Sequence, residues 1–134
     1  MSLPDTNAVV RAYLAADEGI KAFFAPDAPR IYCPRLPEGA DLPAIGFFTR
    51  GGSASPYIPD IPTPSVQFDC WADSPIVARE LYRKLYDALQ GIQMVVMGAN
   101  MIKSAREEVQ GVDMVDVDVP GYFRVLSFFE VKLC

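Results

Sequence analysis

The chain has 134 residues, of which 51% are hydrophobic and 22% are charged. This length predicts a single domain over residues 1–134 that buries a core without disulfides or a metal. The net charge of −5 argues against sequence-specific nucleic-acid binding, which needs clustered Lys and Arg. We expect no signal peptide and no membrane span, because the best apolar run, 92–102, is short and interrupted by polar residues.

The N-terminal part of the chain predicts one helix and two short strands. The helix begins near Asp5, and its apolar residues form a narrow face that ends at Leu14. Strands are predicted at 30–33 and 44–50, where the second places alternate apolar residues on one side. We interpret the proline-rich stretch 51–64 as a long loop.

The segment 65–91 predicts the unit around which the fold is organised, a buried strand followed by the longest helix. Apolar and polar residues alternate from Val66, which places Trp71 on the face opposite the buried residues. Pro75 suits the first turn of a helix, and Gly91 suits its left-handed end. Between them, apolar residues recur at steps of three and four and form one stripe.

The C-terminal part predicts more strands. We expect strand material at 94–97 and 101–106 with a break near Gly98, an acidic irregular segment at 107–121, and a long last strand at 122–133. Helices therefore lie at the two ends of a group of strands rather than strictly between them. This order predicts an α+β fold, with a mainly antiparallel sheet of about four to five strands and two helices packed on one face.

The residue types needed for common catalytic sites are missing. The chain contains no histidine, which removes Ser-His-Asp and Cys-His catalysis and most zinc sites. The stretches 51–55 and 46–51 only partly match a nucleophile elbow and a phosphate loop. Cys33, Cys70 and Cys134 lack metal-ligand spacing and indicate reduced thiols, as in a cytosol. We therefore expect no catalytic residue, no cofactor and no metal.

Carboxylates leave one enzymatic alternative open. The acidic residues from Glu107 to Asp118 do not have the spacing of an EF-hand, so we interpret them as a solvated loop. Asp69 and Glu130 lie on predicted strands. A small hydrolase that uses paired carboxylates is therefore the alternative hypothesis.

The loop at 51–64 has a regular feature of its own. Pro56, Pro59 and Pro62 recur at every third residue, the period of polyproline II, and Tyr57 lies among them. Two interpretations are open. The loop is either a docking arm, as in a Pro-rich adaptor, or a stiff connector between two strands.

One face of the last strand carries more apolar residues than is usual for a face exposed to water. Tyr122, Arg124, Leu126 and Phe128 share the face opposite the predicted core, and Trp71 points the same way on its own strand. Either a further helix or another subunit must cover this face. Because the sequence predicts only two substantial helices, we favour a subunit.

The order of these segments carries a resemblance to a known family. The segments that carry it are Leu14–Asp17, Arg30–Tyr32, the strand after Pro43, Val66–Ala72, the helix containing Ala78–Arg79, and Tyr122–Phe128. In this order the chain resembles the small tail-terminator proteins of long-tailed bacteriophages and prophages, also called tail-completion or head–tail joining proteins. The resemblance covers nearly the whole chain, and its most specific part is the strand Val66–Ala72 with the helix that follows.

The resemblance implies a structural protein of virion assembly rather than an enzyme. Such a protein caps the finished tail tube and joins it to the head connector as a homo-oligomeric, typically hexameric ring. Its partners would be further copies of itself, the tail tube protein and the head connector protein, with no membrane involved. It would be made in the cytoplasm of the bacterial host and end in the virion tail.

Overall fold

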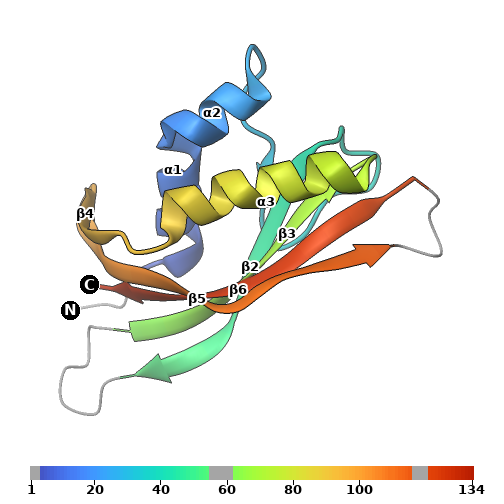
Figure 1. Ribbon diagram of the computed structural model, residues 1–134. Coiled ribbons are helices and arrows are strands. Elements are labelled where there is room, and N and C mark those ends of the chain that lie inside the picture. The colour runs from blue at the N-terminus through green and yellow to red at the C-terminus, as the bar shows by residue number, and fades with distance from the viewer. Residues whose placement is uncertain (1–3, 55–61, 116–120) are drawn as a thin grey trace.

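Figure 1 shows the computed structural model of the protein, which describes residues 4–54, 62–115 and 121–134. The described residues form three helices and six strands. In chain order they are α1 (Thr6–Ala16), α2 (Glu18–Phe24), β1 (Ile31–Tyr32), β2 (Ala44–Ala54), β3 (Pro62–Ala72), α3 (Pro75–Leu89), β4 (Gln93–Met97), β5 (Asn100–Val115) and β6 (Phe123–Leu133). The α+β class predicted from the sequence is confirmed.

The strands form one sheet in the order β1-β2-β3-β6-β5-β4. β1 pairs with β2 in parallel, and the other neighbouring strands pair antiparallel. The six described strands and three described helices compare with the four to five strands and two helices expected. The additional helix, α2, is only seven residues long and begins at the Asp17 cap, whose side chain accepts a hydrogen bond from the Ile20 N–H.

Two segments interpreted as irregular belong partly to strands. The predicted loop 51–64 was too long, because β2 continues to Ala54 and β3 begins at Pro62, with Ser53 opposite Thr63. The segment 107–121 was wrongly taken as irregular throughout, because β5 continues to Val115. The extra length comes from pairing with neighbouring strands, and bulges in β5 break the alternation that a sequence pattern would need.

The helices all lie on one side of the sheet, as Figure 1 shows. We call this side the inner face and the opposite side the outer face. The core lies between the inner face and the helices, and its largest fully buried side chains include Phe47, Phe68, Phe129 and Leu85. None of the described helices combines the length and apolar character needed to cross a bilayer.

The central unit has the structure that its sequence predicts. Val66, Phe68 and Cys70 are fully buried in the core. The apolar stripe of α3 faces the sheet, and its buried residues are Ala78, Leu81, Tyr82, Leu85, Ala88 and Leu89. Gly91 follows the helix with a φ of +80°, a left-handed conformation that glycine adopts without a Cβ penalty.

Candidate functional site

The outer face is the surface on which the sequence predicted an interface. Because Val66, Phe68 and Cys70 point into the core, the alternation of β3 directs Gln67, Asp69 and Trp71 outward. On β6 the register places Phe128 opposite Gln67, Leu126 opposite Asp69, and Arg124 opposite Trp71. The sequence-predicted residues Trp71, Arg124, Leu126 and Phe128 are therefore on one face of two adjacent strands.

Apolar side chains continue from these strands onto both neighbours. Phe48 of β2 lies opposite Gln67, Val109 of β5 lies opposite Phe128, and Val112 lies opposite Leu126. We call these five apolar residues, Phe48, Val109, Val112, Leu126 and Phe128, the outer band. Val109 and Val112 are 44% and 47% exposed, and the other three are half-buried. The outer band extends from β2 to β5, with Gln67 of β3 between Phe48 and Phe128, so its residues are a group rather than isolated exposed side chains.

An aromatic cluster adjoins the outer band. The rings of Trp71 and Tyr122 meet edge to face with their centres 6.1 Å apart. The Arg124 guanidinium lies 5.2 Å from the centre of the Trp71 ring and 3.4 Å from an oxygen of Asp69. The structure thus brings together Trp71, Tyr122 and Arg124, which the sequence predicted as interface residues. All three are half-buried.

Asp69 gives this cluster an unusual electrostatic character. Its side chain is only 12% exposed although it lies on the outer face. Burial raises the pKa of the Asp69 carboxyl, while the charge of Arg124 and a hydrogen bond from Gln67 oppose the shift. The chain itself contributes to the burial here, because the backbone around Leu36 passes close to Gly46, the residue opposite Asp69.

Charged side chains border the other side of the outer band. The Arg50 guanidinium lies 4.1 Å from the centre of the Phe128 ring. Arg106 and Glu130 form an ion pair at 3.1 Å, and the Ser65 hydroxyl donates a hydrogen bond to Glu108 at 2.7 Å. The outer face thus has an apolar centre with both signs of charge at its edge, an arrangement typical of protein–protein interfaces.

The proline-rich segment gives less information. Pro56, Tyr57 and Pro59 lie outside the described residues. Pro62 is the first residue of β3 and pairs with Ala54, so it belongs to a strand rather than to a loop. The interpretation as a docking arm therefore stays a prediction that concerns the tip of the β2–β3 hairpin.

The carboxylates of the hydrolase hypothesis lie apart. Asp69 and Glu130 are on the same face, but Asp69 pairs with Leu126, and Glu130 is four positions further along β6. That spacing corresponds to about 13 Å along a strand, whereas paired catalytic carboxylates lie about 5–9.5 Å apart. Each carboxylate also faces its own arginine.

The acidic segment does not gather into one site either. Glu107 accepts a hydrogen bond from the Tyr82 hydroxyl on the inner side, Glu108 accepts from Ser65, and Asp113 pairs with Arg79 at 3.6 Å. Asp116 and Asp118 lie outside the described residues. Within the described part of the chain, no group of three or more acidic or cysteine residues is placed to hold a metal ion.

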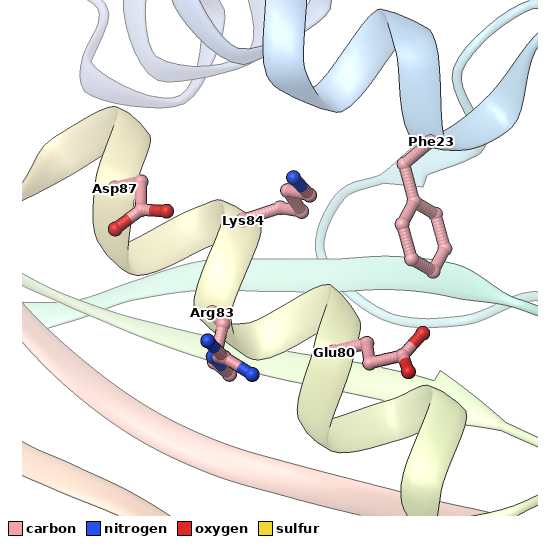
Figure 2. A pocket seen from close by; sticks show the side chains of 5 residues that line it. All are labelled: Phe23, Glu80, Arg83, Lys84 and Asp87. Carbon is pink, nitrogen blue, oxygen red and sulfur yellow. The ribbon is translucent and has the colours of Figure 1, made fainter.

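A shallow pocket of about 330 Å³ lies between α2 and α3. Figure 2 shows Phe23 of α2 above a row of charged side chains from α3, namely Glu80, Arg83, Lys84 and Asp87. Two cations and two carboxylates leave the lining without a net charge. The pocket therefore has no preference for an anion or a cation, and its charges are those of a mixed solvated helix face.

Three residues of the outer band were not predicted from the sequence. Phe48 could have been found, because it follows Phe47 and must point away from the core if Phe47 points into it. Val109 and Val112 are three positions apart, which in an unbroken strand would place them on opposite faces. Only the paired register of β5 and β6 shows that they share one.

A scan against models of protein families finds no match to this chain, and a search of curated proteins finds none either.

Proposed function

We propose that this protein is a non-enzymatic assembly protein that binds further copies of itself through the outer face of its sheet. The observation that carries the proposal is the outer band, whose five apolar residues lie on β2, β6 and β5, on the face that carries none of the described helices. Removing such side chains from water contributes roughly 25 cal/mol per Å² of apolar area. A subunit that packs on the outer band gains this free energy.

A second copy of the chain is a suitable occupant because the border of the outer band carries both signs of charge. Arg50 lies over the Phe128 ring, Arg106 pairs with Glu130, and Glu108 accepts a hydrogen bond from Ser65. A surface with both signs can align with another copy of the same chain without the repulsion that a single sign would produce. Trp71 and Tyr122 supply the large aromatic contact area that is enriched at protein interfaces.

The resemblance narrows this proposal to a tail-terminator role. In that role, a homo-oligomeric, hexameric ring caps the finished tail tube of a long-tailed phage and joins it to the head connector. The support is the position of the most specific segment, Val66–Ala72, in the strand between β2 and β6, with α3 directly after it. The tail tube protein and the head connector protein would then be the further partners.

The first test is the mass of the protein under native conditions. We expect native mass spectrometry and sedimentation to report a closed oligomer at micromolar concentration, and electron micrographs to place it at the end of tail tubes. A monomer that persists at high micromolar concentration, with no effect of the protein on tail length or head attachment, would reject the proposal.

The hydrolase hypothesis is the less favoured one because of the separation between Asp69 and Glu130. Its test is a screen of the purified protein against phosphate-ester, ester and glycoside substrates. An activity that Asp69→Asn and Glu130→Gln each abolish, in a protein that stays monomeric, would favour the hydrolase over the assembly protein.

A further inference from the structure

The stretch of β5 that contributes to the outer band is irregular. From Glu107 to Val112, β5 makes five residue steps, whereas β6 makes only three between their partners, Phe129 and Leu126. Two residues of β5 are therefore extra, one in each of two bulges. Bulges matter here because a shift of one residue moves a side chain to the other face of a sheet.

The two bulges decide which side chains of β5 reach the outer face. Consider an unbroken ladder in which Glu107 lies opposite Phe129. The residues opposite Phe128 and Leu126 would then be Glu108 and Gln110. With the two extra residues, these positions belong to Val109 and Val112. The bulges thus replace two polar side chains by two apolar ones in the outer band.

The second bulge is held from the opposite side of the sheet by α3. The Gly111 N–H donates a hydrogen bond to the Tyr82 hydroxyl at 3.1 Å, and Arg79 donates one to the Gly111 carbonyl at 3.2 Å. A bulge leaves backbone groups without ladder partners, and buried backbone groups need partners. Here the side chains of α3 supply both.

Tyr82 also contacts the first bulge. Its hydroxyl donates a hydrogen bond to the Glu107 carboxylate, and Gln90 accepts from the Glu107 N–H at 2.6 Å. Burial, followed by the hydrogen bond to Glu107, raises the pKa of Tyr82 to about 12, so the hydroxyl keeps its proton at neutral pH. One tyrosine hydroxyl therefore connects Glu107, which precedes both valines, with Gly111, which lies between them.

Gly111 has a matching steric role. A Cβ built on it would lie 2.6 Å from Arg79 Nη1, 2.7 Å from Val125 Cγ1 and 2.9 Å from the Tyr82 ring. Only a residue without a side chain lets α3 approach the backbone of β5 this closely.

We propose that Tyr82 and Arg79 are positioning residues of the interaction surface, which act through the backbone of β5 to present Val109 and Val112 on the outer face. That this surface binds further copies of the chain depends on the proposed function. The register that α3 imposes is a property of the single chain and is tested separately.

The test compares Tyr82→Phe with the wild-type chain. This change keeps the ring but removes the hydroxyl that accepts from Gly111 and donates to Glu107. We expect nuclear magnetic resonance to report loss of the cross-strand contacts Val109–Phe128 and Val112–Leu126, and faster hydrogen exchange of the Gly111 amide. We expect self-association in sedimentation to weaken about tenfold or more, a loss of about 1.4 kcal/mol.

The matched control is Tyr86→Phe. Tyr86 is half-buried on the same helix, with its ring 6.4 Å from that of Tyr82, and within the described residues its hydroxyl donates no hydrogen bond. It should leave the contacts, the exchange rate and the association unchanged. Arg79→Gln is the second variant if Tyr82→Phe does not fold, and it should loosen the same valine contacts, because the bond to the Gly111 carbonyl is lost.

The two proposals fail in different ways. If the valine contacts of β5 persist in Tyr82→Phe and in Arg79→Gln, α3 does not set the register and this inference is wrong. If the contacts are lost as expected but the wild-type chain never associates, the inference about the register holds and the proposed function is wrong.

Discussion

The guanidinium of Arg50 lies 4.1 Å from the centre of the Phe128 ring. The two residues belong to β2 and β6, which are separated by β3, so this contact crosses a strand on the outer face. Arg50 therefore covers part of Phe128, a residue for which the sequence predicted a helix or another subunit as the cover. A cation over an aromatic ring contributes about 0.5–1 kcal/mol at an exposed site, which is far less than full burial of a phenylalanine.

The first prediction concerns Phe128→Lys. We expect the chain to stay folded, because the core lies on the inner face, and we expect its self-association to be lost. A lysine in an apolar contact, next to Arg50, costs several kcal/mol. Circular dichroism melting measures the folding, and light scattering measures the mass.

The control for Phe128→Lys is Ile76→Lys. Ile76 is 70% exposed on α3, away from the outer band, so this change should alter neither the melting nor the mass. A fully assembled Phe128→Lys protein would show that Phe128 is simply exposed. An unfolded one would place Phe128 in the core of the monomer.

The second prediction concerns the pH dependence of stability. Burial raises the pKa of the Asp69 carboxyl above its ordinary value of 3.8, so the folded chain binds this proton more tightly than the unfolded chain does. Ionisation of Asp69 therefore costs stability, and its contribution to the free energy of unfolding falls as the pH rises through the folded pKa. Asp69→Asn should remove this contribution.

The measurement for Asp69→Asn is urea unfolding of both proteins from about pH 7 down to about pH 4, the range above the ordinary pKa of an aspartate. Wild type should gain stability relative to the variant as the pH is lowered. A difference between the two that is constant over this range would show that Asp69 has an ordinary pKa in the folded chain.

The third prediction compares two buried serines. The Ser127 hydroxyl is fully buried and has no hydrogen-bond partner within the described residues, whereas the Ser65 hydroxyl donates to Glu108 at 2.7 Å. Ser127→Ala should leave the free energy of unfolding unchanged or raise it by up to about 1 kcal/mol, because it removes an unsatisfied polar group. Ser65→Ala should lower it by about 1 kcal/mol.

Chemical unfolding of the two alanine variants gives both values in one experiment. If Ser127→Ala destabilises the chain as much as Ser65→Ala does, the Ser127 hydroxyl has a partner in solution, such as a buried water.

The fourth prediction concerns the tip of the β2–β3 hairpin. Because Ala54 pairs with Pro62, a short Gly/Ser turn in place of residues 55–61 keeps every residue of the described β2–β3 pairing. We expect the domain to stay folded, since loop length has a small effect on the closure entropy. If the prolines form a docking arm, ring formation or tail attachment should weaken. Unchanged sedimentation and intact complementation of tail assembly would reduce the segment to a connector.

Elements with local signals could be predicted from the order of the amino acids. The alternation in β3 and β6, the stripe of α3 and the glycine that ends it each need only a few neighbouring residues to be recognised. The same alternation identified Trp71, Leu126 and Phe128 as outward residues of their strands. Side chains on one face repeat every two residues in a strand and every 3.6 residues in a helix, so the spacing of apolar residues in the sequence indicates each element.

Relations between residues far apart in the chain could be recognised only in the folded structure. Val109 and Val112 share a face because of the bulge between them, where the backbone of Gly111 bonds to Tyr82 and Arg79, some thirty positions earlier in the chain. Arg50 meets Phe128 only because β2 and β6 flank the same strand. The spacing of residues within a strand cannot encode such relations, because the register between strands is fixed by packing and hydrogen bonds across the sheet.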